Sequence, residues 1–272
     1  MHPRLFTIGG FTQHTYGFLV ATAFIVGLAV AVRLARREGL SADKVFNLGV
    51  YVALAAVLGA KLLLVLTDLR YYARNPGEIL SLASLQAGGV FYGGLVGAIV
   101  FALWYTRHAG LPLLKACDVF APAVSLGHAV GRLGCFSAGC CYGKPTSLPW
   151  GVTFTDSYAH DMFGTPLGVR LHPTQLYEAF AETAIFFLLL ARFRRKQFDG
   201  QVMALYLAVY GAVRFCLEFV RDDPDRGFLF GGWMSTSQFI AILMIVLAAA
   251  FWVWKRAVPA PAHRVPRTAT RH

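Results

Sequence analysis

Two arginines in otherwise apolar sequence, Arg132 and Arg214, are the residues with the clearest potential for chemistry. An ionisable side chain in hydrocarbon costs roughly 3 kcal/mol or more, so such residues are rare in membrane segments and usually serve a function. An arginine offers a planar fork of donors that pairs bidentately with carboxylate or phosphate. We therefore predict that both arginines bind an anionic group. The alternative for Arg132 is a kinked packing helix whose arginine only reaches for the membrane surface.

Further polar residues recur four positions apart around these arginines, a spacing that places side chains on one helix face. The pairs are His128 and Arg132, Glu178 and Glu182, Tyr210 and Arg214, and Arg214 and Glu218. Together with Lys61, the ionisable members gather toward one end of the apolar segments that contain them. Scattered charges would not gather in this way, so we predict a polar cavity open at that end. For Arg214 and Glu218, the alternative is a buried ion pair that only orients two helices.

Three cysteines, Cys135, Cys140 and Cys141, follow Arg132 closely. A disulfide from Cys135 to one of the other two is one alternative, and packing by small side chains is a second. Metal or redox chemistry is the third, although the spacing is a weak match to zinc sites and needs a further ligand such as His160 or His172. We assign no metal ligand and expect no cofactor.

The chain that must position these residues has the composition of an integral membrane protein. Of its 272 residues, 57% are hydrophobic and 14% are charged, whereas soluble domains have about 25% charged residues. Apolar runs of about 17–25 residues cross a bilayer as helices. We predict an all-α bundle of seven transmembrane helices over residues 16–34, 45–67, 89–105, 116–136, 176–191, 202–220 and 237–254. Residues 1–256 form one domain, and residues 257–272 form a disordered basic tail.

Lysines and arginines are more frequent at one set of helix ends. Arg33, Arg36 and Arg37 lie at the end of the first apolar run, and the C-terminal tail adds more from Lys255 onward. Because the basic side of a membrane protein is cytoplasmic, we predict an outside N-terminus and a cytoplasmic C-terminus. The polar residues then face outward. This topology and the attraction to anionic lipid explain the formal net charge of +11, so we expect no nucleic-acid partner.

The segment around Arg132 resembles a known family signature. Residues Gly131 to Gly143 read GRLGCFSAGCCYG, and the bacterial phosphatidylglycerol-prolipoprotein diacylglyceryl transferases have G-R-x-G-N-F-x-N-G-E-x-x-G. Other family motifs are resembled in the same order along the chain. They are HTYG from His14, GGVFYGGLVG from Gly88, HPTQLYE from His172 and GAVRFCLEFVRDDPD from Gly211. The sequence is therefore identified as a divergent member of this family over nearly its whole length.

The resemblance implies a multi-pass enzyme of the bacterial cytoplasmic (inner) membrane. Such an enzyme moves diacylglycerol from phosphatidylglycerol to the lipobox cysteine of a prolipoprotein signal peptide, forms a thioether and releases glycerol phosphate. Arg132 and Arg214 are the predicted catalytic arginines, because positive charge is needed where negative charge develops. The predicted substrate-binding residues are Arg132, Tyr16, Gly143, Gln175, Tyr177, Tyr210, Glu218 and Arg221.

The chain departs from the family pattern at several positions, and three of them bear on the chemistry. Tyr92 replaces the histidine of the third span, Cys135 replaces an asparagine, and Cys140 replaces an acidic residue. A phenol is a poor base at neutral pH, although it can donate a hydrogen bond to phosphate. We therefore predict His14 and Tyr92 as catalytic residues. Three alternatives stay open for activation of the substrate thiol: His14, which we favour as the base, Tyr92 with a pKa shifted by a nearby arginine, or a lowered pKa of the substrate thiol itself. The departures also support an alternative function, a non-transferase relative that binds a lipid, a metal or a redox partner through its cysteines.

Overall fold

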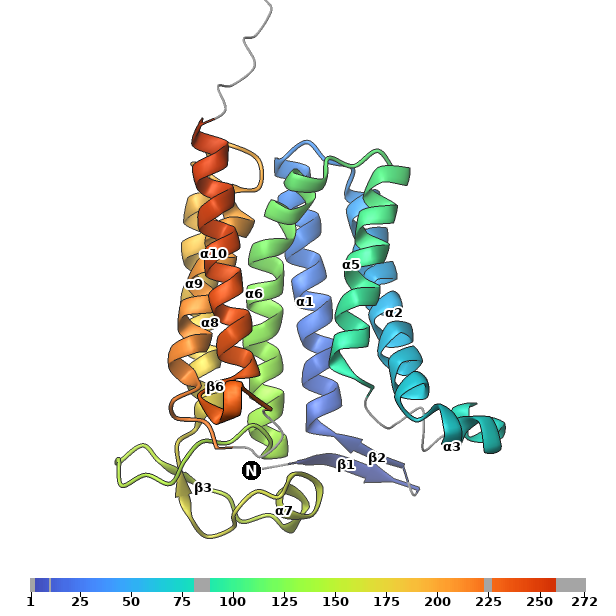
Figure 1. The fold of residues 1–272 in the computed structure, drawn as a ribbon, viewed down its shortest axis with the longest axis vertical. Coiled ribbons are helices and arrows are strands. Elements are labelled where there is room, and N and C mark those ends of the chain that lie inside the picture. The colour runs from blue at the N-terminus through green and yellow to red at the C-terminus, as the bar shows by residue number, and fades with distance from the viewer. Residues whose placement is uncertain (1–2, 10, 81–88, 223–226, 258–272) are drawn as a thin grey trace, which may run out of the picture.

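The computed structural model describes residues 3–9, 11–80, 89–222 and 227–257. The long helices are α1 (Thr15–Arg37), α2 (Ala42–Thr67), α5 (Phe91–His108), α6 (Leu113–Ala138), α8 (Thr174–Phe193), α9 (Gln201–Leu217) and α10 (Thr236–Ala257). They run side by side in one bundle (Figure 1). Their ends differ from the predicted apolar runs by three residues or fewer. The predicted tail lies outside the described residues, apart from Ala257 at the end of α10.

The surface of the bundle is suited to hydrocarbon. Among the described helices, four are long and apolar enough to cross a membrane: α1, α2, α6 and α10. The outer faces of α2 and α5 expose large apolar side chains, such as Leu58 at 70%, Leu62 at 61% and Val96 at 60%. Apolar faces of this kind are unfavourable in water and favourable in lipid. The prediction of a mostly helical membrane protein is confirmed.

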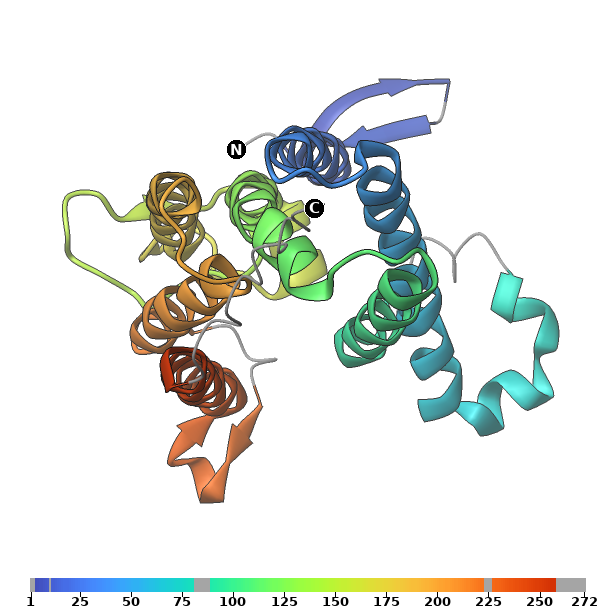
Figure 2. The same ribbon diagram turned by 90° about the horizontal axis from the view of Figure 1, so that it is seen from above.

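Helix α6 lies at the centre of the bundle, between α1 and α8 (Figure 2). On either side of this core, α2 packs with α5, and α9 packs with α10. Small residues bring α1 and α6 together, because a Cβ on Gly27 would lie 3.0 Å from the carbonyl oxygen of Ala123. Close backbone approach of this kind is how membrane helices associate without a hydrophobic driving force. As a result, side chains of α6 face helices on both of its sides.

One end of the bundle carries the short elements. They are the antiparallel hairpin β1 (Arg4–Ile8) and β2 (Phe11–His14), the helices α3 (Leu69–Arg74), η1 (Pro76–Leu80), α7 (Ser157–Phe163) and η3 (Phe230–Gly232), and the strand pairs β3 (Val152–Thr153) with β4 (Arg170–Leu171) and β5 (Phe228–Leu229) with β6 (Met234–Ser235). Tyr142, Phe154 and Leu171 form a small buried core beneath the loop that holds α7. Helix α6 ends here and α8 begins here (Figure 1), so two of the predicted motifs meet at this end.

Candidate active site

Arg132 extends from the last part of α6 and pairs with a carboxylate of α8. Its Nε lies 3.0 Å from Glu178 Oε2, and its Nη2 donates to Glu178 Oε1 at 3.1 Å. Both side chains are largely buried, at 15% and 2% exposed, so the pair is costly to break. The third nitrogen, Nη1, lies 4.0 Å from Cys135 Sγ. The guanidinium therefore has a fixed orientation, with two of its nitrogens on Glu178 and one toward the cysteines.

His128 lies one turn before Arg132 and joins the same network. Its Nδ1 is 2.7 Å from Glu182 Oε1, and its Nε2 accepts from Arg132 Nε at 3.1 Å. Since Nε2 accepts, the ring proton sits on Nδ1 and is donated to Glu182. Glu182 is fully buried and also accepts from Ser125 Oγ at 2.6 Å. The imidazole is thereby fixed from both sides.

Helix α9 completes the network with two tyrosines. The hydroxyl of Tyr210 donates to Glu178 Oε1 at 3.2 Å, and that of Tyr206 donates to Glu182 Oε1 at 3.4 Å. Their rings stack with centroids 5.7 Å apart. The network therefore joins α6, α8 and α9. The four-residue spacings in the sequence correctly indicated the shared faces. Tyr206, four residues before Tyr210, continues the same spacing but was not predicted, and Ser125 had no such signal.

Arg214 holds α9 against α10. Its Nη1 lies 2.8 Å from Glu218 Oε2, and its Nη2 donates to Ser237 Oγ at 2.8 Å. The ion pair joins residues four apart at the end of α9, and it is the hydrogen bond to Ser237 that reaches α10. Tyr210, one turn before Arg214, lies within electrostatic reach of both Arg132 and Arg214. The two arginines thus belong to one neighbourhood, and no contact between their side chains is found within the described residues.

The three cysteines after Arg132 meet where α6 ends. The Sγ atoms of Cys135, Cys140 and Cys141 lie within 4.8 Å of one another. All three are free thiols in this structure, so the predicted disulfide is not found. The backbone of Cys141 has φ +60°, in the left-handed region that is strained for a residue with a side chain. The loop is therefore folded tightly so that the sulfurs converge.

Side chains at the start of α8 fix the backbone of this loop. Gln175 Nε2 donates to the carbonyl oxygen of Cys140 at 2.6 Å, and Thr174 Oγ1 donates to that of Cys141 at 2.7 Å. Gln175 is 1% exposed, and its Oε1 is buried without a hydrogen-bond partner among the described residues. The structure thus places Gln175, a predicted substrate-binding residue, directly beneath the cysteine loop.

Gly143 lies where three segments meet. Its N–H donates to the carbonyl oxygen of His172 at 3.1 Å, and its backbone pairs with that of Arg221. A Cβ at this position would lie 2.6 Å from the carbonyl oxygen of Val220, so glycine is required. Arg221 is buried, at 6% exposed. The hydroxyl of Tyr177 lies 3.1 Å from Nδ1 of the same His172, which brings a further predicted residue to this junction.

Two predicted residues at the start of α1 lie on the margin of the network. His14 stacks on Tyr158 with ring centroids 5.2 Å apart, and its Nδ1 is buried without a hydrogen-bond partner among the described residues. Tyr16 packs against the backbone of Gly134 in α6. It lies within electrostatic reach of Arg132 and of the three cysteines. Tyr16 is thus near the predicted site, whereas the contact recorded for His14 is with α7.

Tyr92 lies apart from the other predicted catalytic residues. It is 49% exposed near the start of α5, where its ring contacts Phe91. Helix α5 packs on α2, on the other side of α6 from α8 and α9 (Figure 2). Among the contacts found in the described part of the chain, none joins Tyr92 to Arg132. The predicted catalytic role of Tyr92 stays a prediction.

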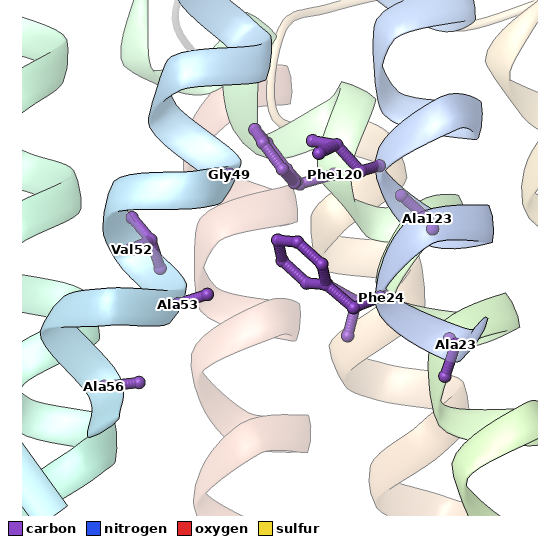
Figure 3. Close-up of a pocket in the computed structure, with 12 residues that line it drawn as sticks. Ala23, Phe24, Gly49, Val52, Ala53, Ala56, Phe120 and Ala123 are labelled. Carbon is purple, nitrogen blue, oxygen red and sulfur yellow. The ribbon is translucent and has the colours of Figure 1, made fainter. Parts of the chain in front are cut away.

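An apolar cavity of about 310 Å³ lies between α1, α2 and α6 (Figure 3). Its walls are small and aromatic residues, including Ala23, Ala53, Phe24 and Phe120. Gly127 also lines it and directly precedes His128 on α6. A cavity with this lining accepts hydrocarbon, and it lies next to the polar network along the same helix.

These features define a helical membrane protein with a buried charged network at one end and an apolar cavity beside it. Residues 3–254 match the family model described as prolipoprotein diacylglyceryl transferase. The chain therefore belongs to this family, and the resemblance seen in its motifs is confirmed.

Several relatives match over most of their length. The chain is 36% identical to the phosphatidylglycerol--prolipoprotein diacylglyceryl transferase of Clostridium tetani, over 91% of this chain and 95% of that protein. It is 37% identical to the protein of the same name from Nitratidesulfovibrio vulgaris, over 90% and 91%. It is 34% identical to the Vibrio vulnificus protein of the same name, over 93% of this chain and 92% of that protein. These matches support a transferase of lipoprotein biosynthesis over the alternative of a non-transferase relative.

Proposed function

We propose that the protein transfers the diacylglyceryl group of phosphatidylglycerol to the thiol of the lipobox cysteine of prolipoproteins and releases glycerol phosphate. The observation that carries this proposal is Arg132, a buried arginine held by Glu178 and His128 in the signature segment of this family. Arginine binds phosphate through parallel donors. It is the residue type that a leaving phosphate group requires.

The proposal includes a topology in which all seven long helices cross the bacterial cytoplasmic (inner) membrane. The N-terminus and the cysteine loop then face outward, and the C-terminus faces the cytoplasm, because basic residues concentrate at the opposite helix ends. Strand β1 and the end of α10 lie at opposite ends of the bundle (Figure 1), as an odd number of crossings requires. Residues 1–256 act as a single domain in this proposal.

The reaction needs an anion site and a base. The substrate sulfur attacks the diacylglyceryl carbon that carries the phosphate ester, and the C–O electron pair leaves with glycerol phosphate. Arg132 and Arg214 stabilise the charge that develops on the phosphate oxygens. The thiol proton must pass to a base, for which His14 and Tyr92 are the residues indicated by the family motifs. Substrate contacts are assigned to Tyr16, Gly143, Gln175, Tyr177, Tyr210, Glu218 and Arg221.

The geometry adds His128 as a positioning residue and a further candidate for the base. Its Nε2 accepts a hydrogen bond from Arg132 Nε, while Nδ1 is held by Glu182. When a phosphate takes the donors of Arg132, Nε2 loses this partner and becomes available to accept a proton. Phosphate binding and base activation would thereby be coupled through one arginine.

The acyl chains have a place in the apolar cavity between α1, α2 and α6. The cavity borders His128 through Gly127, so a lipid can place its chains among apolar residues and its head group at the network. Burial of each methylene contributes about 0.8 kcal/mol. The diacylglyceryl group would therefore remain bound while its phosphate ester is broken.

The test is transfer of labelled lipid from phosphatidylglycerol to a lipobox peptide by the purified protein in detergent. Arg132→Gln and Arg214→Gln should each lower turnover roughly a hundredfold, because one charge-assisted contact to a developing anion contributes about 3 kcal/mol. Arg194→Gln, an exposed arginine at the other end of the bundle, is the matched control and should leave transfer unchanged. Wild-type turnover in both site variants would rule out the phosphate-binding role.

A further inference from the structure

The cysteine loop carries side chains that the transfer mechanism above does not use. The Sγ atoms of Cys135, Cys140 and Cys141 lie within 4.8 Å of one another. A zinc ion bound at about 2.3 Å to three sulfurs in a tetrahedral arrangement would hold the sulfurs about 3.8 Å apart. Closing the remaining distance takes shifts of under ~1 Å, which small side-chain rotations supply. The three thiols are thus arranged almost as a metal would hold them.

The backbone that carries these sulfurs is already fixed. Cys141 is held in the left-handed region at φ +60°, where strain of this kind often marks a functional site. The carbonyl oxygens of three consecutive loop residues accept hydrogen bonds from three buried side chains. The donors are Thr165 to Gly139 at 2.8 Å, Gln175 to Cys140 at 2.6 Å and Thr174 to Cys141 at 2.7 Å. A ligand at the sulfurs would therefore meet a site that needs little reorganisation.

The charges around the loop also suit a thiolate site. Three thiolates with one divalent ion carry a net charge of minus one. Arg132 Nη1 lies 4.0 Å from Cys135 Sγ, and the buried Arg221 lies within electrostatic reach of Cys141. These two arginines offset the negative charge. The amide of Gln175 also leaves its buried Oε1 without a hydrogen-bond partner among the described residues, so an acceptor is available near the site.

We propose that Cys135, Cys140 and Cys141 bind one soft divalent ion such as Zn²⁺, and that its open fourth position takes the thiol of the acceptor peptide. Thiolates select zinc over the hard ions Mg²⁺ and Ca²⁺. Three protein ligands with one open position are the arrangement of catalytic zinc sites. This inference departs from the sequence-based expectation of no metal, and its second part rests on the proposed transferase function.

Such a site would supply the thiol activation that the missing family histidine leaves open. A thiol bound to a divalent ion loses its proton, which passes to water. The bound sulfur forms the C–S bond to the diacylglyceryl carbon, and the C–O electron pair leaves with glycerol phosphate. The product thioether is neutral and a weaker ligand, so it dissociates. Because Arg132 lies 4.0 Å from Cys135 Sγ, the leaving phosphate and the attacking sulfur would be neighbours.

The first experiment uses the wild-type protein, purified in detergent without chelators. Elemental analysis should find one zinc per chain. Chelation should expose three additional thiols to alkylation, at Cys135, Cys140 and Cys141, and added Zn²⁺ should protect them again. Replacement by Cd²⁺ should produce the ultraviolet absorption of sulfur-to-metal charge transfer. Less than a tenth of an equivalent of metal after Zn²⁺ loading, or a disulfide between two of these cysteines in the freshly purified protein, would overturn the proposal.

Serine variants show which cysteines bind the metal, and measurements of lipid transfer show whether the metal takes part in the reaction. Cys135→Ser, Cys140→Ser and Cys141→Ser should each lose the Cd²⁺ absorption, while Cys117→Ser and Cys216→Ser should retain it. If these variants do not fold, removal of the metal from the wild-type protein and its reloading with Zn²⁺ test the proposal without them. Metal removal should lower lipid transfer on the order of a hundredfold, reversibly with Zn²⁺. Undiminished transfer without metal overturns thiol activation, whereas absent transfer by the metal-loaded protein counts against the transferase function and leaves the binding result standing.

Discussion

Helix α6 carries a buried charged cluster at each end, and the two clusters are built differently. Near its start, Asp118 is fully buried and accepts from Lys196 Nζ at 3.0 Å and from the backbone N–H groups of Gly200 and Val202 at 2.8 Å each. It thereby caps the first turn of α9. Lys196 also pairs with Glu38 at 2.6 Å. Burial by itself lowers the pKa of Lys196, but the hydrogen bonds to Glu38 and Asp118 outweigh it and raise the pKa.

The cluster at the other end contains polar groups that lack a full set of hydrogen bonds. Arg132 has one nitrogen directed at a thiol rather than at an oxygen, and the Oε1 atom of Gln175 is buried without a partner among the described residues. Cys141 is in a strained backbone conformation. At the Asp118 end, by contrast, both carboxylate oxygens accept hydrogen bonds, and the buried group without a partner among the described residues is Gln201 Nε2; unsatisfied polar groups are more frequent where a ligand binds. We therefore expect the Asp118 cluster to stabilise the fold and the Arg132 network to take part in the proposed chemistry.

Removing the carboxylate of Asp118 is expected to have the largest effect on stability. Asp118→Ala removes the acceptor of three backbone N–H groups, those of Gly200, Val202 and Met203, and one of the carboxylates paired with Lys196, which should cost about 3–5 kcal/mol of unfolding free energy. Thermal unfolding in detergent measures this change. Lipid transfer per folded molecule should stay at the wild-type level. A loss of transfer at unchanged stability would contradict the division between the two clusters.

Arg132→Lys should have the opposite effect to Asp118→Ala, with a large loss of lipid transfer and little loss of stability. Lysine keeps the charge but loses the planar fork that binds Glu178 and would bind phosphate. We expect a decrease in kcat/KM of roughly a hundredfold and a smaller change in the unfolding temperature than Asp118→Ala produces. Arg194→Lys, on the exposed surface, is the control. Transfer within twofold of wild type would show that charge alone is sufficient at position 132.

Gly143→Ala tests whether the junction beneath the cysteine loop must be tightly packed. The new Cβ would lie 2.6 Å from the carbonyl oxygen of Val220, so the backbone must move, at a cost of about 1–3 kcal/mol. Gly131→Ala is the matched control in the same signature, since a Cβ there meets no atom within 4 Å. The unfolding temperature should fall for the first variant only. Equal unfolding temperatures for both variants would contradict the close packing at Gly143.

The sequence was informative about helices and about which residues share a face. Long apolar runs located the helices, because a bilayer imposes their length. The four-residue spacings brought His128 next to Arg132 and Glu178 next to Glu182. Contacts between distant segments could not be predicted in this way. The double pairing of Arg132 with Glu178 depends on the packing of α6 against α8, and the meeting of the cysteine sulfurs depends on a loop in which Gly139 and Cys141 are both left-handed.

The smallest effects are expected at Tyr92, a predicted catalytic residue for which no contact with Arg132 is found among the described residues. If its hydroxyl assists the reaction, Tyr92→Phe should lower kcat severalfold by removing one neutral hydrogen bond, which contributes about 1 kcal/mol. Tyr92→His restores the residue type of the family motif and should leave transfer unchanged or raise it. Tyr51→Phe is the control, because Tyr51 on α2 is similarly exposed, at 43% against 49% for Tyr92. If Tyr92→Phe and Tyr51→Phe both transfer lipid at the wild-type rate, Tyr92 has no catalytic role, and thiol activation must come from another group, such as His14, His128 or a metal ion at the three cysteines.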